Sequence, residues 1–351
     1  MKDYMTDVNA ILKQYIGKGL IPCAQAAVVT TEGVYSTSQG FSSLLPKREV
    51  LREDAVFDLA SLTKVVATTT LALQCLEKGL LNLDMPIQYL LLDFPYSEVT
   101  VGHVMTHTSG ICHDDKAYKQ LNSKEELREF FFQKPLEFKP GSQVVYSDFG
   151  YIALGFMIEA VLGPLDTVFQ RDIAKPLDMR DTGYCPASRG LSERCVPTEI
   201  TKERGRIQGE VHDGKAHILH GVSGNAGLFS TMEDLTHFVT MMLQGGVFKG
   251  EKVLSQASVN QLKKCKTEGL NQRRTLGWWT DEPAMSFGDY YSSICIYHTG
   301  FTGTSIYIDF LRGCGIILLT NRIHPTRENP YITDFRNMVH NAILSQWELE
   351  K

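Results

Sequence analysis

The residues in this sequence best suited to chemistry are a serine and a lysine three positions apart, Ser61 and Lys64, inside the apolar segment 58–67. Residues three apart lie on one face of a helix, so the Lys64 ammonium can reach the Ser61 hydroxyl. A serine becomes a good nucleophile once a neighbouring group takes its proton. Lysine takes that proton only where burial or other cations lower its pKa from about 10.4. This S-x-x-K spacing predicts either a nucleophilic Ser61 or a helix-capping serine followed by a solvated lysine.

Ser61 is predicted to begin a helix that continues to about Lys78 and ends at Gly79. A place in the first turn puts the positive end of the helix dipole and free backbone N–H groups beside any oxyanion that forms there. Two further polar segments follow later in the chain, Tyr146-Ser147-Asp148 and His298-Thr299-Gly300. A tyrosine close to a serine and an ammonium can act as general base and then as general acid, whereas most tyrosines are core residues with a bonded hydroxyl.

In this order, Ser61-Leu62-Thr63-Lys64, Tyr146-Ser147-Asp148 and His298-Thr299-Gly300 resemble the three motifs of the serine β-lactamase and penicillin-binding-protein superfamily. The resemblance is to its class C-like branch, which also holds D,D-carboxypeptidases, D-aminopeptidases and esterases. Further segments similar to that branch are spread along nearly the whole chain: Leu83-Asp84-Met85-Pro86, Thr106-His107-Thr108-Ser109-Gly110, Lys139-Pro140-Gly141, Gly227-Leu228-Phe229-Ser230-Thr231 and His298-Thr299-Gly300-Phe301-Thr302-Gly303.

The resemblance implies a role for each motif residue. Ser61 is the nucleophile that forms an acyl-enzyme, and Lys64 and Tyr146 are the other catalytic residues. The strand before His298 edges the site and pairs with the substrate, and a glycine after it lets the acyl group approach closely. The backbone N–H groups of Ser61 and Phe301 form the oxyanion hole. The residues expected to support the site or line its pocket are Asp148, His298, Thr299 and Gly300, with His212 and Asn225 in a segment similar to an active-site loop.

Two positions depart from the usual pattern of the branch. Many members carry lysine at position 298, where a permanent charge binds a substrate carboxylate, whereas His298 is expected to be mostly neutral near pH 7. Efficient β-lactam hydrolysis is therefore not expected. Position 148 is usually asparagine, and a carboxylate from Asp148 beside Lys64 would hold the lysine in its charged form. That interaction would transfer the role of base to Tyr146.

Hydrophobic periodicity and turn residues predict an α+β fold. Helices are expected at 8–15, 234–243 and 334–347, and a hairpin at 24–30 and 33–38. The region 55–179 is expected to be mostly helical, with helices at 101–105 and 124–132 among others. Strands are expected at 276–279, 290–298, 304–309 and 315–320. With the resemblance, this order predicts a β-lactamase/transpeptidase-like fold, an antiparallel sheet flanked by helices in an α/β/α sandwich. Residues 1–60 and 190–351 are expected to form a discontinuous sheet domain and 61–189 an inserted helical domain, with the active site between them.

Composition narrows the class of protein. The chain has 351 residues, of which 43% are hydrophobic and 21% charged, as in an ordinary globular protein. A net charge of −5 argues against nucleic acid as a partner. No stretch approaches the roughly 20 apolar residues of a membrane span. The N-terminus does not resemble a signal peptide and the eight cysteines contain no C-x-x-C pair, so we expect a cytoplasmic protein with reduced thiols.

Two other catalytic classes are disfavoured. His103 and His107 are four apart, and His212, His217 and His220 gather near Asp213, but neither group forms H-E-x-x-H or another closed metal-site pattern. No metal or other cofactor is expected. The G-x-S-x-G sequence of α/β-hydrolases is absent around Ser61.

The sequence therefore predicts a serine acyl hydrolase whose partner is a small-molecule substrate. Small esters and D-amino-acid amides or peptides are the expected substrates. A β-lactamase or a D,D-carboxypeptidase is the alternative, because the same motifs serve those reactions. A second alternative is a non-catalytic penicillin-recognising protein that keeps the fold without turnover.

Overall fold

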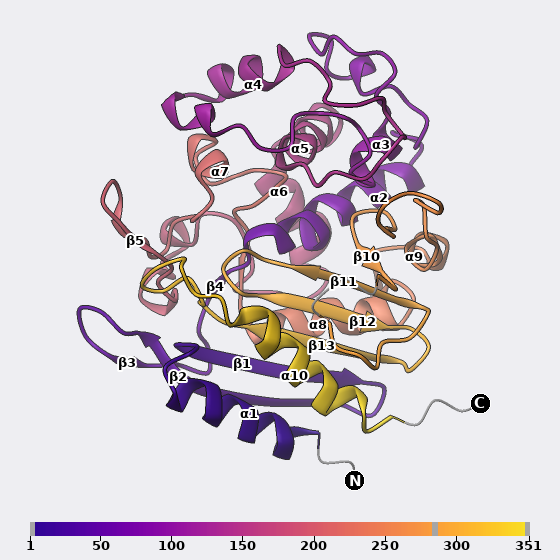
Figure 1. The fold of residues 1–351 in the computed structure, drawn as a ribbon. Coiled ribbons are helices and arrows are strands. Elements are labelled where there is room, and N and C mark those ends of the chain that lie inside the picture. Colours follow the sequence, from indigo (N-terminus) through magenta and orange to yellow (C-terminus); the bar gives the residue numbers. More distant parts are fainter. Residues whose placement is uncertain (1–3, 283–286, 348–351) are drawn as a thin grey trace.

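A seven-stranded antiparallel sheet lies at the centre of the computed structural model, which describes residues 4–282 and 287–347. The strand order is β10-β11-β12-β13-β1-β2-β3, so strands from both ends of the chain share one sheet (Figure 1). The β1–β13 ladder joins them, with Ala27 opposite Ile317. The predicted fold class is confirmed. The strands are β1 (Cys23–Thr30), β2 (Val34–Ser43), β3 (Glu49–Val50), β10 (Trp279–Thr280), β11 (Cys295–Thr299), β12 (Ser305–Asp309) and β13 (Cys314–Leu319).

Helices cover both faces of this sheet (Figure 1). Successive side chains of a strand point to opposite faces, and β1 is apolar on both. Ala26 and Val28 pack in a cluster with α1 (Met5–Gly17) and α10 (Ile332–Leu344). Ala27 and Val29 pack in the larger core, together with α8 (Met232–Leu243). Burial on both faces explains why β1 is almost uniformly apolar.

In the sequence, a mainly helical region separates the N-terminal strands of the sheet from its C-terminal strands. Its longest helix, α5 (Asp148–Leu162), is apolar around most of its circumference and buried from Phe149 to Ile158, so it forms the centre of that region. The surrounding helices are α2 (Thr70–Glu77), α3 (Val101–Met105), α4 (Lys124–Phe132), α6 (Leu165–Phe169), α7 (Gly214–Ile218) and α9 (Gln256–Leu262). Short paired strands complete the fold: β4 (Phe57–Asp58) with β7 (Phe229–Ser230), β5 (Ile200–Thr201) with β6 (Gly205–Arg206), and β8 (Val247–Phe248) with β9 (Glu251–Lys252).

The predicted single helix from Ser61 to Lys78 is wrong in detail. A 3₁₀ turn (Ala60–Leu62) is followed by a π-helical segment (Lys64–Thr69), and α2 begins only at Thr70. The Thr70 hydroxyl donates to the Val65 carbonyl at 3.0 Å inside this irregular stretch. π-Helical turns are rare and are often found at functional sites. The predicted end is right, because Gly79 adopts a positive φ of 68°.

Two predicted strands are shorter in the structure. Residues 276–278 form a tight turn, in which the Thr275 N–H donates to Trp278 at 3.0 Å and Gly277 has a φ of 83°. Residues 290–294 are a loop, because the Ser292 hydroxyl bonds Asp309 at 2.8 Å and accepts from the Ile294 N–H. Helix α8 also starts earlier than predicted, because the N-cap is Thr231, whose hydroxyl accepts from the Asp234 N–H at 3.2 Å.

Among residues 4–282 and 287–347, no single helix is long and apolar enough to cross a membrane. The bent pair 148–162 and 165–174 meets this criterion of length and composition only when its two parts are taken together.

Candidate active site

The turn that carries Ser61 is held in an unusual backbone conformation. Ala60 has a φ of +46°, a region that residues with a side chain rarely adopt. The Asp58 carboxylate stabilises it by accepting from the Ala60 N–H at 2.8 Å, and its other oxygen accepts from the His212 N–H at 2.8 Å. Strained backbone of this kind concentrates at functional sites. Ser61 is thereby presented at the edge of the sheet, and its side chain lines a pocket.

Lys64 is fully buried and uses all three of its N–H donors. Its Nζ lies 3.1 Å from Ser61 Oγ, 2.7 Å from Asp148 Oδ1 and 2.9 Å from the Asn225 carbonyl oxygen. The contact expected from the three-residue spacing is therefore present. An ammonium with three acceptors has no lone pair, so in this state Lys64 donates to Ser61 and takes no proton from it.

Asp148 bridges two buried lysines. Its Oδ1 accepts from Lys64, and its Oδ2 accepts from Lys215 at 3.1 Å. Burial alone would lower the pKa of Lys64, but the Asp148 carboxylate and the neighbouring Tyr146 raise it above its usual value. Burial opposes ionisation of Asp148 as well, yet the two ammonium groups hold the pKa of this carboxyl well below its usual range. The structure thus favours the charged form of Lys64.

Tyr146 stands against Lys64 just before α5. The Lys64 Nζ lies 4.8 Å from the centroid of the Tyr146 ring, and the ring stacks on His107 at a centroid distance of 4.5 Å. The main chain here is fixed from both sides, because the Ser147 N–H donates to His107 Nδ1 at 3.1 Å and the Ser147 hydroxyl caps α5 by accepting from Gly150. His107 itself has a positive φ of 58°. These contacts fix Tyr146 between the nucleophile and the sheet.

The loop that follows His298-Thr299-Gly300 is hydrogen-bonded to the turn that carries Ser61. The Thr302 hydroxyl donates to the Asp58 carbonyl at 2.8 Å, and the Thr304 hydroxyl donates to the Leu59 carbonyl at 3.1 Å. A Cβ on Gly300 would lie 2.4 Å from the same Leu59 oxygen. The sequence explanation for Gly300, room for the acyl group, is therefore incomplete, because the space beside it holds the backbone of the nucleophile turn.

His298 is the second-last residue of β11, and its buried ring lines the pocket. Its Nδ1 lies 2.9 Å from the Thr299 carbonyl, so Nδ1 carries the proton and Nε2 is left as a bare acceptor. Burial, reinforced by the charges of Arg274 and Lys64, lowers the pKa of His298 well below its usual value. The neutral imidazole expected near pH 7 therefore has a physical cause here.

The pocket beside Ser61 has a volume of about 300 Å³. Its wall toward the C-terminal helix carries two arginines, Arg322 and Arg336, although both also donate to main-chain carbonyls. Positive charge is therefore present in the pocket even though His298 is neutral. Phe301 is 45% exposed at the rim, and its N–H has no acceptor within the described part of the chain. The remaining lining residues are Tyr146, Trp279, His298, Thr299, Gly300 and Ile332.

His212 and Asn225 lie outside the wall of this pocket. Asn225 contributes its carbonyl to Lys64, while its side-chain amide bonds Asp213 and Ser223. The His212 ring stacks on Phe301 at a centroid distance of 5.7 Å and bonds Glu199 at 2.9 Å. His212 lines a separate pocket of about 520 Å³.

Comparison with known proteins places the chain in a family. The Beta-lactamase family model matches residues 8–339, nearly the whole chain. This chain belongs to the beta-lactamase family. It is 29% identical to an N-acetylmuramyl-L-alanine amidase of Bacillus subtilis (strain 168), with 93% of this chain and 83% of that protein covered. It is 30% identical to a protein of Salmonella newport (strain SL254) named "Putative D-alanyl-D-alanine carboxypeptidase", with 85% and 76% covered.

The beta-lactamase fold is also found by structural similarity. EstCE1, described as a hydrolase with promiscuous acyltransferase activity, superimposes with a TM-score of 0.78 at 20% identity, with 97% of this chain and 98% of that chain covered. The family and the fold predicted from the three motifs are confirmed, and the chain is a serine acyl hydrolase of the beta-lactamase family.

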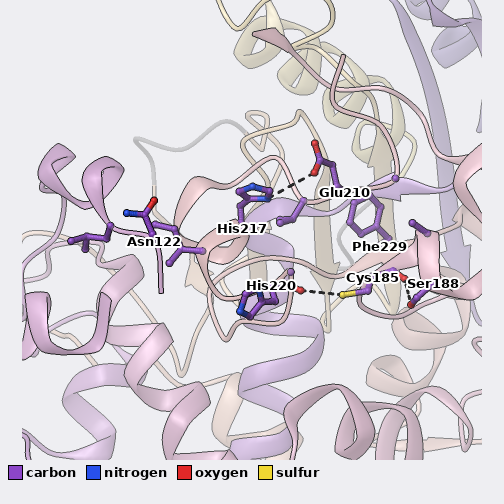
Figure 2. A pocket seen from close by; sticks show the side chains of 13 residues that line it. Asn122, Cys185, Ser188, Glu210, His217, His220 and Phe229 are labelled. Carbon is purple, nitrogen blue, oxygen red and sulfur yellow. Dashed lines mark hydrogen bonds and ion pairs between the residues drawn. The ribbon is translucent and has the colours of Figure 1, made fainter. Parts of the chain in front are cut away.

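A second pocket in this beta-lactamase-family protein contains His217 and His220, two of the five histidines that raised a metal-site alternative. Figure 2 shows the side chains that line it, with His217 and His220 among them. The pocket has a volume of about 600 Å³ and shares no lining residue with the Ser61 pocket. His217 Nδ1 lies 3.8 Å from Glu210, and the Cys185 thiol donates to the His220 carbonyl at 3.4 Å. Within the described ranges, no three His, Cys, Asp or Glu side chains are grouped so that they could hold a metal ion.

Several site residues were not found from the sequence. Lys215, Arg322 and Arg336 carry no motif, and each reaches the site only through the packing of elements far apart in the chain. Arg274 is fully buried behind Tyr146, with its Cζ 5.6 Å from the ring centroid. The one available signal was an arginine two positions before the apolar segment 276–279.

Proposed function

We propose that the enzyme works through an acyl-enzyme on Ser61, with Tyr146 as the base. The observation that carries this proposal is the Lys64 geometry. Its Nζ donates to Ser61, Asp148 and the Asn225 carbonyl, which leaves it no lone pair for proton transfer. Tyr146 is the remaining titratable group that lies against Lys64 and lines the Ser61 pocket. The Lys64 ammonium then stabilises negative charge on the Ser61 oxygen and on the Tyr146 phenol oxygen during the proton transfer.

The acylation step balances with these groups alone. The Tyr146 phenolate takes the proton of Ser61 while the Ser61 oxygen forms a bond to the acyl carbon. The bond from that carbon to the leaving oxygen or nitrogen then breaks, and the Tyr146 phenol protonates the leaving group. In deacylation, water attacks the acyl carbon and gives a proton to the Tyr146 phenolate. The bond between the acyl carbon and the Ser61 oxygen then breaks, and the Tyr146 phenol returns the proton to Ser61.

The oxyanion formed in each step needs donors beside the acyl carbon. We assign this role to the backbone N–H groups of Ser61 and Phe301. Support comes from the 3₁₀ turn at Ser61, from the Phe301 N–H without an acceptor in the described ranges, and from the Thr304 bond that fixes one loop on the other. Removal of one such donor typically lowers the rate by about 10²–10³.

We infer that the substrates are small esters and D-amino-acid amides or peptides. The name of one curated relative, "Putative D-alanyl-D-alanine carboxypeptidase", supports D-amino-acid peptides. The other, an N-acetylmuramyl-L-alanine amidase, supports cleavage of an amide bond without indicating a D-amino acid. Arg322 and Arg336 favour substrates that bear a carboxylate near the scissile bond. A cytoplasmic location is part of this proposal, and it is supported by buried thiols such as Cys23 and Cys75, which form no disulfide.

The test compares wild type with Ser61→Ala on p-nitrophenyl butyrate, D-alanyl peptides and nitrocefin. We expect wild type to hydrolyse the ester with a higher kcat/KM than nitrocefin, and intact-mass spectrometry to show an acyl adduct. Ser61→Ala should lose the adduct and nearly all turnover while keeping its thermal stability. An unchanged rate in Ser61→Ala would refute the nucleophile. A folded wild type that shows neither an adduct nor turnover would indicate a non-catalytic binding protein.

A further inference from the structure

Arg274 is a fully buried guanidinium without a visible partner. Its Nε, Nη1 and Nη2 are all buried, and none has a hydrogen-bond acceptor among residues 4–282 and 287–347. Its Cζ lies 3.6 Å from the Trp279 ring centroid and 5.6 Å from that of Tyr146. The main chain on either side is fixed, since the Arg274 N–H donates to the Thr267 hydroxyl at 2.8 Å and its carbonyl accepts from Lys266 at 2.7 Å.

Such a group is unfavourable for folding. A cation removed from water loses its hydration, and a carboxylate in contact would normally compensate for that loss. Arg274 has no such contact in the described structure, and burial lowers the pKa of its guanidinium to about 10. Its neighbour Arg273, by comparison, pairs with Asp281 at 2.8 Å near the surface. A nonpolar residue at position 274 would serve stability at least as well, so a role in the reaction better explains the arginine.

Two imidazoles lie beside Tyr146, His107 at a ring-centroid distance of 4.5 Å and His298 at 6.2 Å, and neither supplies positive charge. His107 Nδ1 accepts from the Ser147 N–H, so its proton is on Nε2, and that nitrogen is buried without a partner in the described chain. His298 has the opposite tautomer, with a bare Nε2 that is also buried. Burial and the charges of Arg274 and Lys64 lower the pKa of both imidazoles well below the usual value. The permanent cations beside Tyr146 are therefore Lys64 and Arg274.

We propose that Arg274 is a positioning residue for acyl transfer, whose buried charge stabilises the phenolate form of Tyr146 and replaces the cation that His298 does not supply. The inference rests on the proposed roles of Ser61 and Tyr146. Arg274 does not line the Ser61 pocket, so it acts through Tyr146 and not on the substrate. The other charged or titratable groups that face this cluster are Lys64, His107, Asp148, Tyr151, Glu282 and His298.

The experiment measures kcat/KM for p-nitrophenyl butyrate against pH in Arg274→Met and Arg274→Lys. The Arg274 Cζ lies 5.6 Å from the Tyr146 ring centroid, and loss of a cation this close to a phenol disfavours the phenolate by about one pH unit. The acid limb of the Arg274→Met profile should therefore move to higher pH by about one unit, which lowers kcat/KM about tenfold on that limb. Arg274→Lys should retain most of the wild-type profile. Arg273→Met, which removes the adjacent surface charge, is the matched control and should not move the limb.

Thermal unfolding separates this role from a structural one. Replacement of an unpaired buried charge by an apolar side chain is often neutral or stabilising, so Arg274→Met should keep or raise the melting temperature while activity falls. A folded fraction that is constant over the acid limb leaves the midpoint of the pH profile unchanged, so the melting temperature of each variant is measured at every pH of the profile. An unmoved acid limb in Arg274→Met, with an active wild type, overturns the role of Arg274. An inactive wild type overturns the proposed function instead.

Discussion

The hydrogen bonds of Lys64 depend partly on the S-x-x-K motif and partly on residues that are far away in the sequence. The S-x-x-K spacing was enough to predict contact between Lys64 and Ser61, and the structure gives that contact as 3.1 Å. The direction of the hydrogen bond depends on Asp148, 84 positions later, and on the carbonyl of Asn225, 161 positions later. Asp148 was found from the sequence only through its departure from asparagine. Lys215, the second cation on that carboxylate, had no signal because its contact depends on how α7 packs.

The bridged carboxylate gives a testable dependence of stability on pH. Asp148 has a folded-state pKa below its unfolded value, so the stability that it contributes is complete above about pH 4 and is lost as the pH falls further. Asp148→Asn removes this contribution and leaves two buried lysines without their anion, at a cost of about 3–5 kcal/mol. Thermal unfolding from pH 2 to 8 should show a gap between wild type and variant that is wide above pH 4 and narrows below it.

Asp178 provides the control for that series. Its carboxylate pairs with Arg180 at 2.8 Å on the exposed surface, where ion pairs contribute little. Asp178→Asn should therefore leave the melting temperature close to wild type at every pH. A constant gap for Asp148→Asn down to pH 2 would contradict an ionised Asp148 in the folded protein.

Elements whose ends are set by local chemistry were predicted well. Helices α3 and α4 have the bounds that the sequence indicated, and their N-caps, Thr100 and Ser123, accept from the N–H groups of His103 and Glu126. Elements shaped by distant contacts were predicted less well. The Ser61 segment breaks into 3₁₀ and π turns under contacts from Asp58 and the 302–304 loop. The turn at Gly277 depends on a bond from its N–H to the Met105 carbonyl at 2.8 Å, which no local pattern reveals.

The close approach of β11 to the Ser61 turn leads to a prediction for Gly300→Ala. The added methyl group would lie 2.2 Å from the Thr304 hydroxyl and 2.4 Å from the Leu59 carbonyl, so one loop must move. We expect a loss of about 1–3 kcal/mol in stability, as for other overpacked sites, and a loss in kcat of at least about tenfold because the oxyanion donors separate. Thermal unfolding and ester kinetics measure the two effects.

Gly17→Ala is a matched substitution for comparison, because nothing lies within 4 Å of the new methyl group at the end of α1. It should keep wild-type kcat and stability within a few tenths of a kcal/mol. Wild-type kcat in Gly300→Ala would show that the spacing between β11 and the Ser61 turn does not matter for catalysis.

At the scale of the molecule, the pocket gathers residues from widely separated segments. Ser61 and Tyr146 come from the part of the sequence between β3 and β10, while Trp279, His298 and Arg336 come from the C-terminal third of the chain. The motif order predicted that these segments meet, because the sheet joins both ends of the chain. It did not predict the charge of the pocket, since no motif includes Arg322 or Arg336. The domain boundaries at residues 60 and 190 stay predictions.

The distribution of charge yields the last prediction. The chain carries a net charge of −5, yet Arg322 and Arg336 line the pocket. A locally positive site in a negative molecule attracts anionic substrates over a range set by salt, about 30 Å at 10 mM and 8 Å at 150 mM. Between these salt concentrations, kcat/KM for mono-p-nitrophenyl succinate should fall severalfold, whereas neutral p-nitrophenyl butyrate should change little. Arg322→Gln should weaken the salt dependence of the succinate ester. An equal response of the two esters would show that the arginines serve the fold alone and do not attract the substrate carboxylate.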